Sequence, residues 1–140
     1  MKRADWQKLA EERVKDAKVL LDGGQWAAAY YLAGYAVESG LKSCVLAYVE
    51  KNPDIIYREK RYSENCWTHD IGTLVQASGL DAIRLAVANT NPAFAANWGH
   101  AQKWSEKMRY VFTPESDAQR LYEAVTQNLN GVLPWIRIHW

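Results

Sequence analysis

The stretch QWAAAYYLAGYAVESGLKSCVLAYVE occupies residues 25–50, and its pattern decides the fold class. Apolar or aromatic side chains recur every three or four residues, which is the spacing of one face of an α-helix. They are Trp26, Tyr30, Ala33, Val37, Leu41, Cys44 and Tyr48. Alanine and glycine beside this stripe widen the apolar surface. We therefore predict a long central helix, covered on more than one side, that stops at Asn52-Pro53 because a residue before proline disfavours the helical conformation.

The chain before this segment carries a second amphipathic pattern. Apolar residues recur at helical spacing over residues 5–21, with Lys and Glu on the other face. Asp5 suits the N-cap position and Gly23-Gly24 the end of the helix. Residues 53–68 are instead polar, aromatic and charged, and we predict a loop there.

Two shorter helices are predicted after that loop. Thr68 is expected to cap a helix from His69 to about Ser78, and Gly79 to stop it. A second short helix is expected over residues 81–88. Residues 93–112 are expected to carry one or two further helical turns.

The last helix has the clearest start signal. In Thr113-Pro114-Glu115, Thr113 is expected to act as the cap and the proline as the first helical residue. Apolar residues then recur on one face as far as Ile136, Leu129 among them, with a kink expected at Pro134. No alternating strand pattern and no internal repeat is present. We predict one all-α domain over residues 1–140, an antiparallel up-and-down bundle of four or five helices.

Composition narrows the class of protein. The 140 residues carry 17 basic and 16 acidic side chains, so the net charge of +1 provides no strong overall field for nucleic acid. No secretory signal and no apolar run of membrane-spanning length is seen. Two cysteines, Cys44 and Cys66, make no disulfide framework and are expected to be reduced thiols. We expect a cytoplasmic protein that is not in a membrane.

Three segments carry a resemblance to a known family. They are residues 28–44 (AAYYLAGYAVESGLKSC), Thr68-His69-Asp70-Ile71 with Leu74, and Arg109-Tyr110 before the capped last helix. Together they resemble the HEPN family of small helical domains, and the resemblance covers nearly the whole chain in element order. It implies a four-helix up-and-down core and often a homodimer.

The resemblance also implies two kinds of activity. Some HEPN proteins are metal-independent endoribonucleases of toxin and defence systems, with an Arg-x(4–6)-His motif. Others partner a minimal nucleotidyltransferase, or resemble the helical substrate-binding half of such enzymes, and bind nucleotides or nucleic acid without cutting them.

The ribonuclease motif is not found in this chain. Its chemistry needs a His to handle protons and an Arg to stabilise the pentavalent phosphate. Arg61 precedes His69 with seven residues between them, and no His follows Arg109 until His139. If the chain is a nuclease after all, Arg61 or Arg109 with His69 would form its degenerate site.

Glu38 and Lys42 are four residues apart and share a helix face with Tyr31 and Tyr35. They form either a structural pair or a polar wall that contacts a ligand or partner. His69 likewise either orients the start of its helix or contacts a ligand.

Residues 57–67 interleave Arg58, Lys60 and Arg61 with aromatic side chains, a combination that suits phosphate contacts and base stacking. A solvated loop covering the end of the bundle is the alternative. Trp98, Trp104, Trp135 and Trp140 are expected in the core or at a dimer interface.

The sequence gives little support for a metal site or a cofactor site. Cys66-x-x-His69 has ligand-like spacing, but no second ligand pair is visible, and no glycine-rich phosphate loop is present. We therefore expect no metal and no cofactor. The predicted protein is a homodimeric, non-catalytic HEPN-like domain. Its candidate binding residues for a nucleotide or RNA are Glu38, Lys42, Arg58, Lys60, Arg61 and His69, and its candidate partner is a nucleotidyltransferase. A metal-independent endoribonuclease and a scaffold without ligand are the alternatives.

Overall fold

The computed structural model describes residues 1–140 and is 76% helical, with no strand. The elements are α1 (Arg3–Asp22), α2 (Trp26–Lys51), α3 (Ile55–Arg58), α4 (Tyr62–Cys66), α5 (Ile71–Ala77), α6 (Asp81–Thr90), α7 (Pro92–Gln102), the 3-10 helix η1 (Glu106–Tyr110), α8 (Glu115–Thr126) and α9 (Val132–Arg137). The all-α antiparallel prediction is confirmed, although the chain divides into more and shorter helices than the four or five expected.

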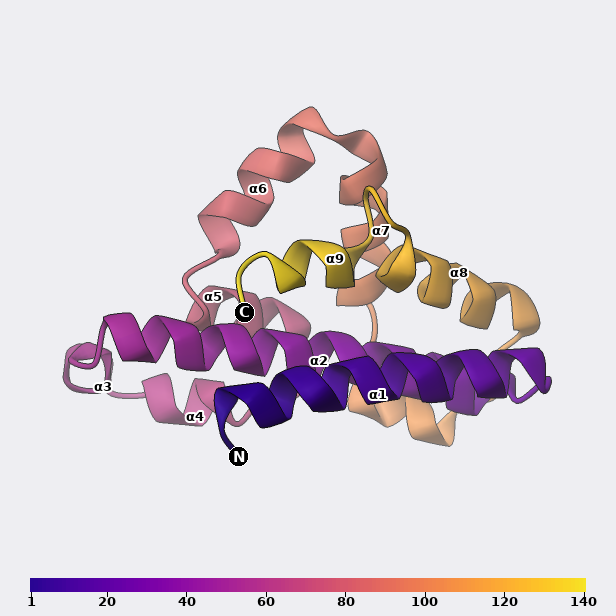
Figure 1. Cartoon of the computed structure of the whole chain (residues 1–140), viewed down its shortest axis with the longest axis horizontal. Helices are drawn as coiled ribbons and strands as arrows, with labels where there is room; N and C mark the ends of the chain where they lie inside the picture. The colour runs from indigo at the N-terminus through magenta and orange to yellow at the C-terminus, as the bar shows by residue number, and fades with distance from the viewer.

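Helix α2 is the centre of the molecule. It lies antiparallel to α1, and α5, α8 and α9 also pack against it (Figure 1). Half of its 26 residues are buried, which is why its apolar stripe is broad and its small residues are many. The predicted central helix, covered on more than one side, is confirmed.

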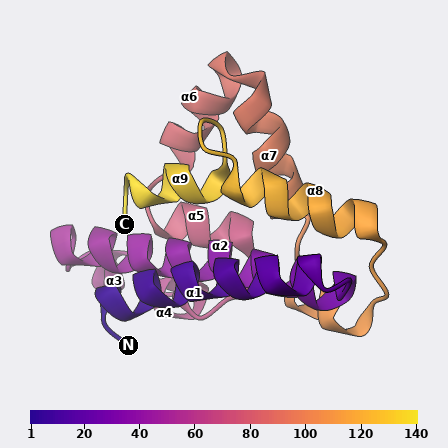
Figure 2. The same ribbon diagram turned by 45° about the vertical axis from the view of Figure 1, so that its right-hand side comes forward.

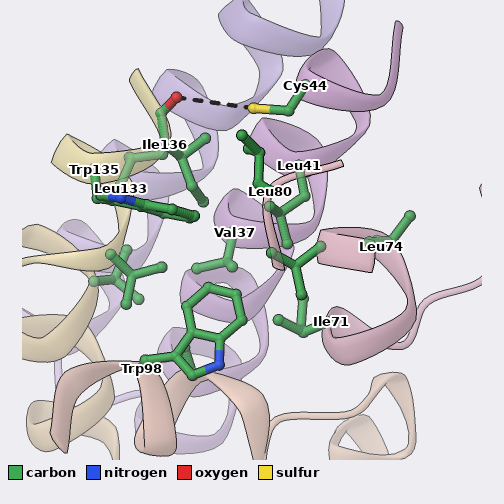
Figure 3. Packing of buried hydrophobic residues seen from close by; sticks show 14 of the residues in the cluster. Val37, Leu41, Cys44, Ile71, Leu74, Leu80, Trp98, Leu133, Trp135 and Ile136 are labelled. Carbon is green, nitrogen blue, oxygen red and sulfur yellow. Dashed lines mark hydrogen bonds between the residues drawn. The ribbon is translucent and has the colours of Figure 1, made fainter. Parts of the chain in front are cut away.

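The core gathers side chains from α2, α5, α7 and α9. Figure 3 shows Leu41 of α2 among Ile71, Leu133 and Ile136, all fully buried, with Trp98 beside them. Burying each such aliphatic side chain contributes about 1.5 to 3 kcal/mol. Gly40 lets α9 come this close, because a Cβ there would lie 2.9 Å from Ile136 Cγ2.

The last helix differs from the sequence-based expectation. It is broken, since α8 ends at Thr126 and α9 starts at Val132, with a turn between them closed by the Gly131 N–H donating to Gln127 O at 2.8 Å. Leu129, expected on the apolar face, sits in this turn and is 91% exposed. Pro134 does not kink a long helix, because it falls in the first turn of α9, where a missing N–H costs no hydrogen bond.

Three cap assignments were also wrong by a few residues. Asp5 lies three residues after the N-cap Lys2 and accepts its backbone N–H at 2.7 Å. Asp70, not Thr68, caps α5 by accepting the Thr73 N–H at 2.7 Å. Helix α8 has no side-chain cap, and Thr113 lies outside it.

The segments predicted to be irregular are more ordered than expected. Residues 53–68 contain α3 and α4, and Tyr62 anchors α4 by donating its hydroxyl to the Ala77 carbonyl. Asn91 caps α7 with Pro92 in its first turn, a start signal that the sequence analysis overlooked. Figure 2 shows the chain leaving α7, passing the end of the α1–α2 hairpin and returning to α8.

No single helix is both long enough and apolar enough to cross a membrane. Helices α5 and α6 meet these two criteria only when they are taken together, and the pair is bent by 113°. Cys44 and Cys66 are free thiols. Cys44 is buried, with Sγ 3.8 Å from the Ile136 carbonyl oxygen (Figure 3).

Candidate functional site

The site is built on Glu38, an acidic residue in the middle of the most apolar helix. Its side chain is only 3% exposed. Lys42, one turn later on α2, donates from Nζ to Glu38 Oε1 at 2.7 Å. His69 Nδ1 lies 3.0 Å from both carboxylate oxygens. A buried carboxylate is costly unless it is paired, and these two partners supply the pairing.

The short segment between α4 and α5 holds His69 in place. Thr68 Oγ1 accepts the Asp70 N–H at 3.1 Å, and Asp70 in turn caps α5. The ring is thus fixed between two acids, with Nδ1 on Glu38 and Nε2 3.2 Å from Glu106 Oε2. Both contacts are hydrogen bonds when the ring is an imidazolium, because then both nitrogens donate.

Beside His69 lies a polar pocket of about 310 Å³, called here the His69 pocket. It is lined by Thr68, His69, Asp70, Trp104, Ser105, Glu106 and Lys107. One wall comes from the start of α5 and the other from the segment that leads into η1. His69 is 40% exposed, so its outer edge faces solvent while its Nδ1 edge is buried on Glu38.

An aromatic group supports the inner side of the site. Tyr35 lies edge-on to Trp104, with ring centroids 5.1 Å apart, and 6.2 Å from His69. Its hydroxyl accepts a hydrogen bond from the Tyr31 hydroxyl at 3.2 Å. The pKa of Tyr35 is raised, first by its burial and second by this hydrogen bond. Trp104 packs directly on Gly34, where a Cβ would lie 2.1 Å from the indole nitrogen.

Arg109 lies at the far end of this aromatic group. Interactions with the hydroxyl groups of Tyr31 and Tyr110 raise the pKa of the Arg109 guanidinium. The guanidinium also sits 4.7 Å from the centroid of the Tyr110 ring. Tyr31 and Tyr35 therefore separate Arg109 from His69.

The structure brings together three of the predicted binding residues, Glu38, Lys42 and His69. It does not bring the basic cluster to them. Arg58 pairs with Asp54 at 2.9 Å on α3, beyond the end of α2. The rise along α2 from Glu38 to its last residue is about 20 Å, so α3 starts that far from the carboxylate.

Lys60 and Arg61 belong to the same exposed turn, and neither is among the hydrogen-bond or ion-pair partners of Glu38 and His69. The Arg61–His69 pairing considered for a nuclease is thus not formed in this structure.

Sequence reasoning missed the second wall of the His69 pocket. Ser105, Glu106 and Lys107 lie inside the segment 93–112 that was expected to carry one or two helical turns, and nothing local marks them as neighbours of His69. Trp104 was expected in the core or at a dimer interface, and with 2% exposure it lies in the core. The one usable signal was Gly34, a glycine inside a helix that leaves room for a large ring.

No group of three or more His, Cys, Asp or Glu side chains is placed to hold a metal ion. Compared with known proteins, the chain matches no family model, no curated protein and no solved structure. The structure shows a small all-helical protein.

Proposed function

We propose that this chain is a HEPN-like helical protein that binds the phosphate of a nucleotide or RNA in the His69 pocket without cutting it. In this proposal it is a homodimer and the partner of a minimal nucleotidyltransferase in a toxin–antitoxin or defence-type module. The resemblance of residues 28–44 and 68–71 to HEPN proteins supports it, because Glu38 and His69, one from each segment, meet at the site.

One observation carries the proposal: a buried carboxylate fixes Nδ1 of His69, so Nε2 is the nitrogen at the pocket side. Lys107 adds a cation to the pocket wall. Thr68 and Ser105 use their hydroxyl oxygens as acceptors from backbone N–H groups, which leaves both O–H groups free to donate. A cation and free donors around one small pocket suit a phosphate, while the Asp70 carboxylate in the same lining is engaged in capping α5.

Glu106 holds the place that the phosphate would take. Its contact with Nε2 is at the surface, with a side chain that is 37% exposed, and it comes from the short η1 helix. Exposed ion pairs contribute little, typically about 0 to 1 kcal/mol, so a dianionic phosphate can displace this carboxylate.

The experiment is isothermal titration calorimetry with AMP and with a short single-stranded RNA. His69→Asn is the informative variant, because its amide nitrogen can still donate to Glu38 from the Nδ1 position while the Nε2 position is lost. We expect binding to weaken about tenfold or more, the size of one charge-assisted hydrogen bond. The exposed Lys15→Gln, on α1, is the matched control and is expected to bind as the unaltered protein does.

A metal-independent endoribonuclease is the second candidate, and one observation favours it. Arg109, unlike Arg61, interacts with Tyr31, which belongs to the aromatic group that lies beside His69. Cleavage of RNA in the absence of metal, lost in both His69→Ala and Arg109→Ala with helical content retained, would replace the binding proposal. A folded protein whose melting temperature no nucleotide or RNA shifts would instead be a scaffold.

A further inference from the structure

A second pocket lies between α7, the segment after η1, and α8, and is called here the α7–α8 pocket. Its volume is about 300 Å³, and it shares no residue with the His69 pocket. That volume is at the lower end of the range of about 300 to 1,000 Å³ for small-molecule sites. In Figure 2 this region is where the chain returns from η1 to the start of α8.

Thr113 is the residue that makes this pocket unusual. It is 9% exposed, and its Oγ1 is buried without any hydrogen-bond partner. The sequence predicted that this hydroxyl would cap α8, but the helix has no side-chain cap. A buried hydroxyl without a partner destabilises a fold, so its presence in a pocket wall points to a partner that arrives with a ligand.

The charge of the pocket indicates the sign of that ligand. Lys103 and His100 take part in none of the ion pairs or side-chain hydrogen bonds of the chain. The single carboxylate, Asp117, is accompanied by Arg120 at 3.6 Å. The unbalanced charge is therefore positive, which favours an anion.

The rest of the lining is apolar. Leu121 is buried in the wall, with Tyr30 and Met108 beside it. Phe112 stands fully exposed at the same pocket and offers an aromatic face to whatever enters. A ligand that covered these side chains would need a flat, apolar body as well as a charge.

We propose that the α7–α8 pocket binds a small aromatic anion, a carboxylate or a phosphate monoester. Lys103 and His100 contact the anionic group, the Thr113 hydroxyl donates to it, and the ring lies between Tyr30, Leu121 and Phe112. This site is separate from the proposed nucleotide site and does not depend on it.

The test uses three probes with one ring system: 2-naphthoate, 2-naphthyl phosphate and the neutral 2-naphthalenemethanol. Binding is followed by calorimetry on the full chain. At least one anion is expected to bind at millimolar concentration or below, about tenfold more tightly than the neutral probe. Which anion binds better distinguishes carboxylate from phosphate.

Two variants assign the site. Lys103→Gln should weaken anion binding about tenfold, whereas Lys15→Gln should not. Thr113→Val should weaken binding and also raise the melting temperature of the free protein, because it removes an unpartnered hydroxyl without changing the shape. His69→Asn should leave naphthoate binding unchanged, which separates this site from the other pocket.

The inference is overturned if neither anion binds, if the neutral probe binds equally well, or if both Lys103→Gln and Thr113→Val bind as the unaltered protein does.

Discussion

At the scale of single residues, Glu38 sets the arrangement of the site. It is a carboxylate inside an apolar helix, and both of its partners depend on it. Replacing this buried acid leaves Lys42, whose side chain is only 12% exposed, without its ion-pair partner, whereas losing an exposed pair would matter little.

Glu38→Gln is therefore expected to lower the free energy of unfolding by about 3 kcal/mol, near the lower limit for breaking a buried ion pair. Glu50→Gln is the control, because Glu50 pairs with Arg3 at 2.6 Å but is 60% exposed. Its effect should stay within about 0.5 kcal/mol. Urea unfolding followed by circular dichroism measures both. Equal effects would mean that burial of Glu38 has no energetic consequence.

Cys44 gives a pH prediction at the same scale. Burial raises the pKa of the Cys44 thiol from its usual 9.0 to about 12. The folded state thus favours the neutral thiol, so this contribution to stability is complete below pH 9.0 and is lost as the pH rises toward about 12. Unfolding free energies measured across that range should fall less steeply in Cys44→Ala. An unchanged slope in the variant would contradict the assignment to Cys44.

At the scale of elements, the contact between α2 and Trp104 joins the fold to the site. Gly34→Ala places a methyl group where the indole ring lies, so the segment carrying Ser105, Glu106 and Lys107 must move. We expect a loss of stability of more than about 2 kcal/mol, together with weaker AMP binding.

Gly99 in α7 is the matched control, since a Cβ there meets nothing within 4 Å. Gly99→Ala should stabilise the protein by about 0.5 to 1 kcal/mol, the usual gain of alanine over glycine inside a helix. Thermal unfolding of both variants is the measurement. A stable Gly34→Ala protein would show that Trp104 can repack without cost.

The helices also show which parts of the structure could be predicted from the sequence. The central helix was predictable because its apolar period is strong and long, and the Glu38–Lys42 pair because it needs only helical spacing. The break before α9 was not predicted, because the apolar face of Val125, Leu129 and Val132 continues through it. In the structure the backbone of Gln127 leaves the helical conformation, with φ −52° and ψ 129°.

The contacts between Glu38, His69 and Glu106 join three separate segments. Local patterns cannot specify such long-range pairings. The basic cluster at residues 58–61 illustrates the opposite error: its mixture of cations and aromatic side chains placed it with His69 at one ligand, but α4 lies between them along the chain.

At the scale of the whole molecule, the homodimer proposal predicts a mass. One chain is 16.0 kDa, so sedimentation equilibrium at micromolar concentration should give twice that value. A single-chain mass at every concentration would remove the dimer, while leaving the binding proposal for the His69 pocket open to its own test.

The most direct test of the central claim observes the imidazole of His69 during a titration with AMP, using the long-range proton–nitrogen NMR spectrum of the histidine rings. Because Glu38 holds Nδ1, the account predicts that the Nε2 resonance of His69 shifts with added AMP while its Nδ1 resonance stays nearly constant. His139, which lines neither proposed site, should not respond. A His69 ring that remains unchanged at saturating AMP would contradict the account.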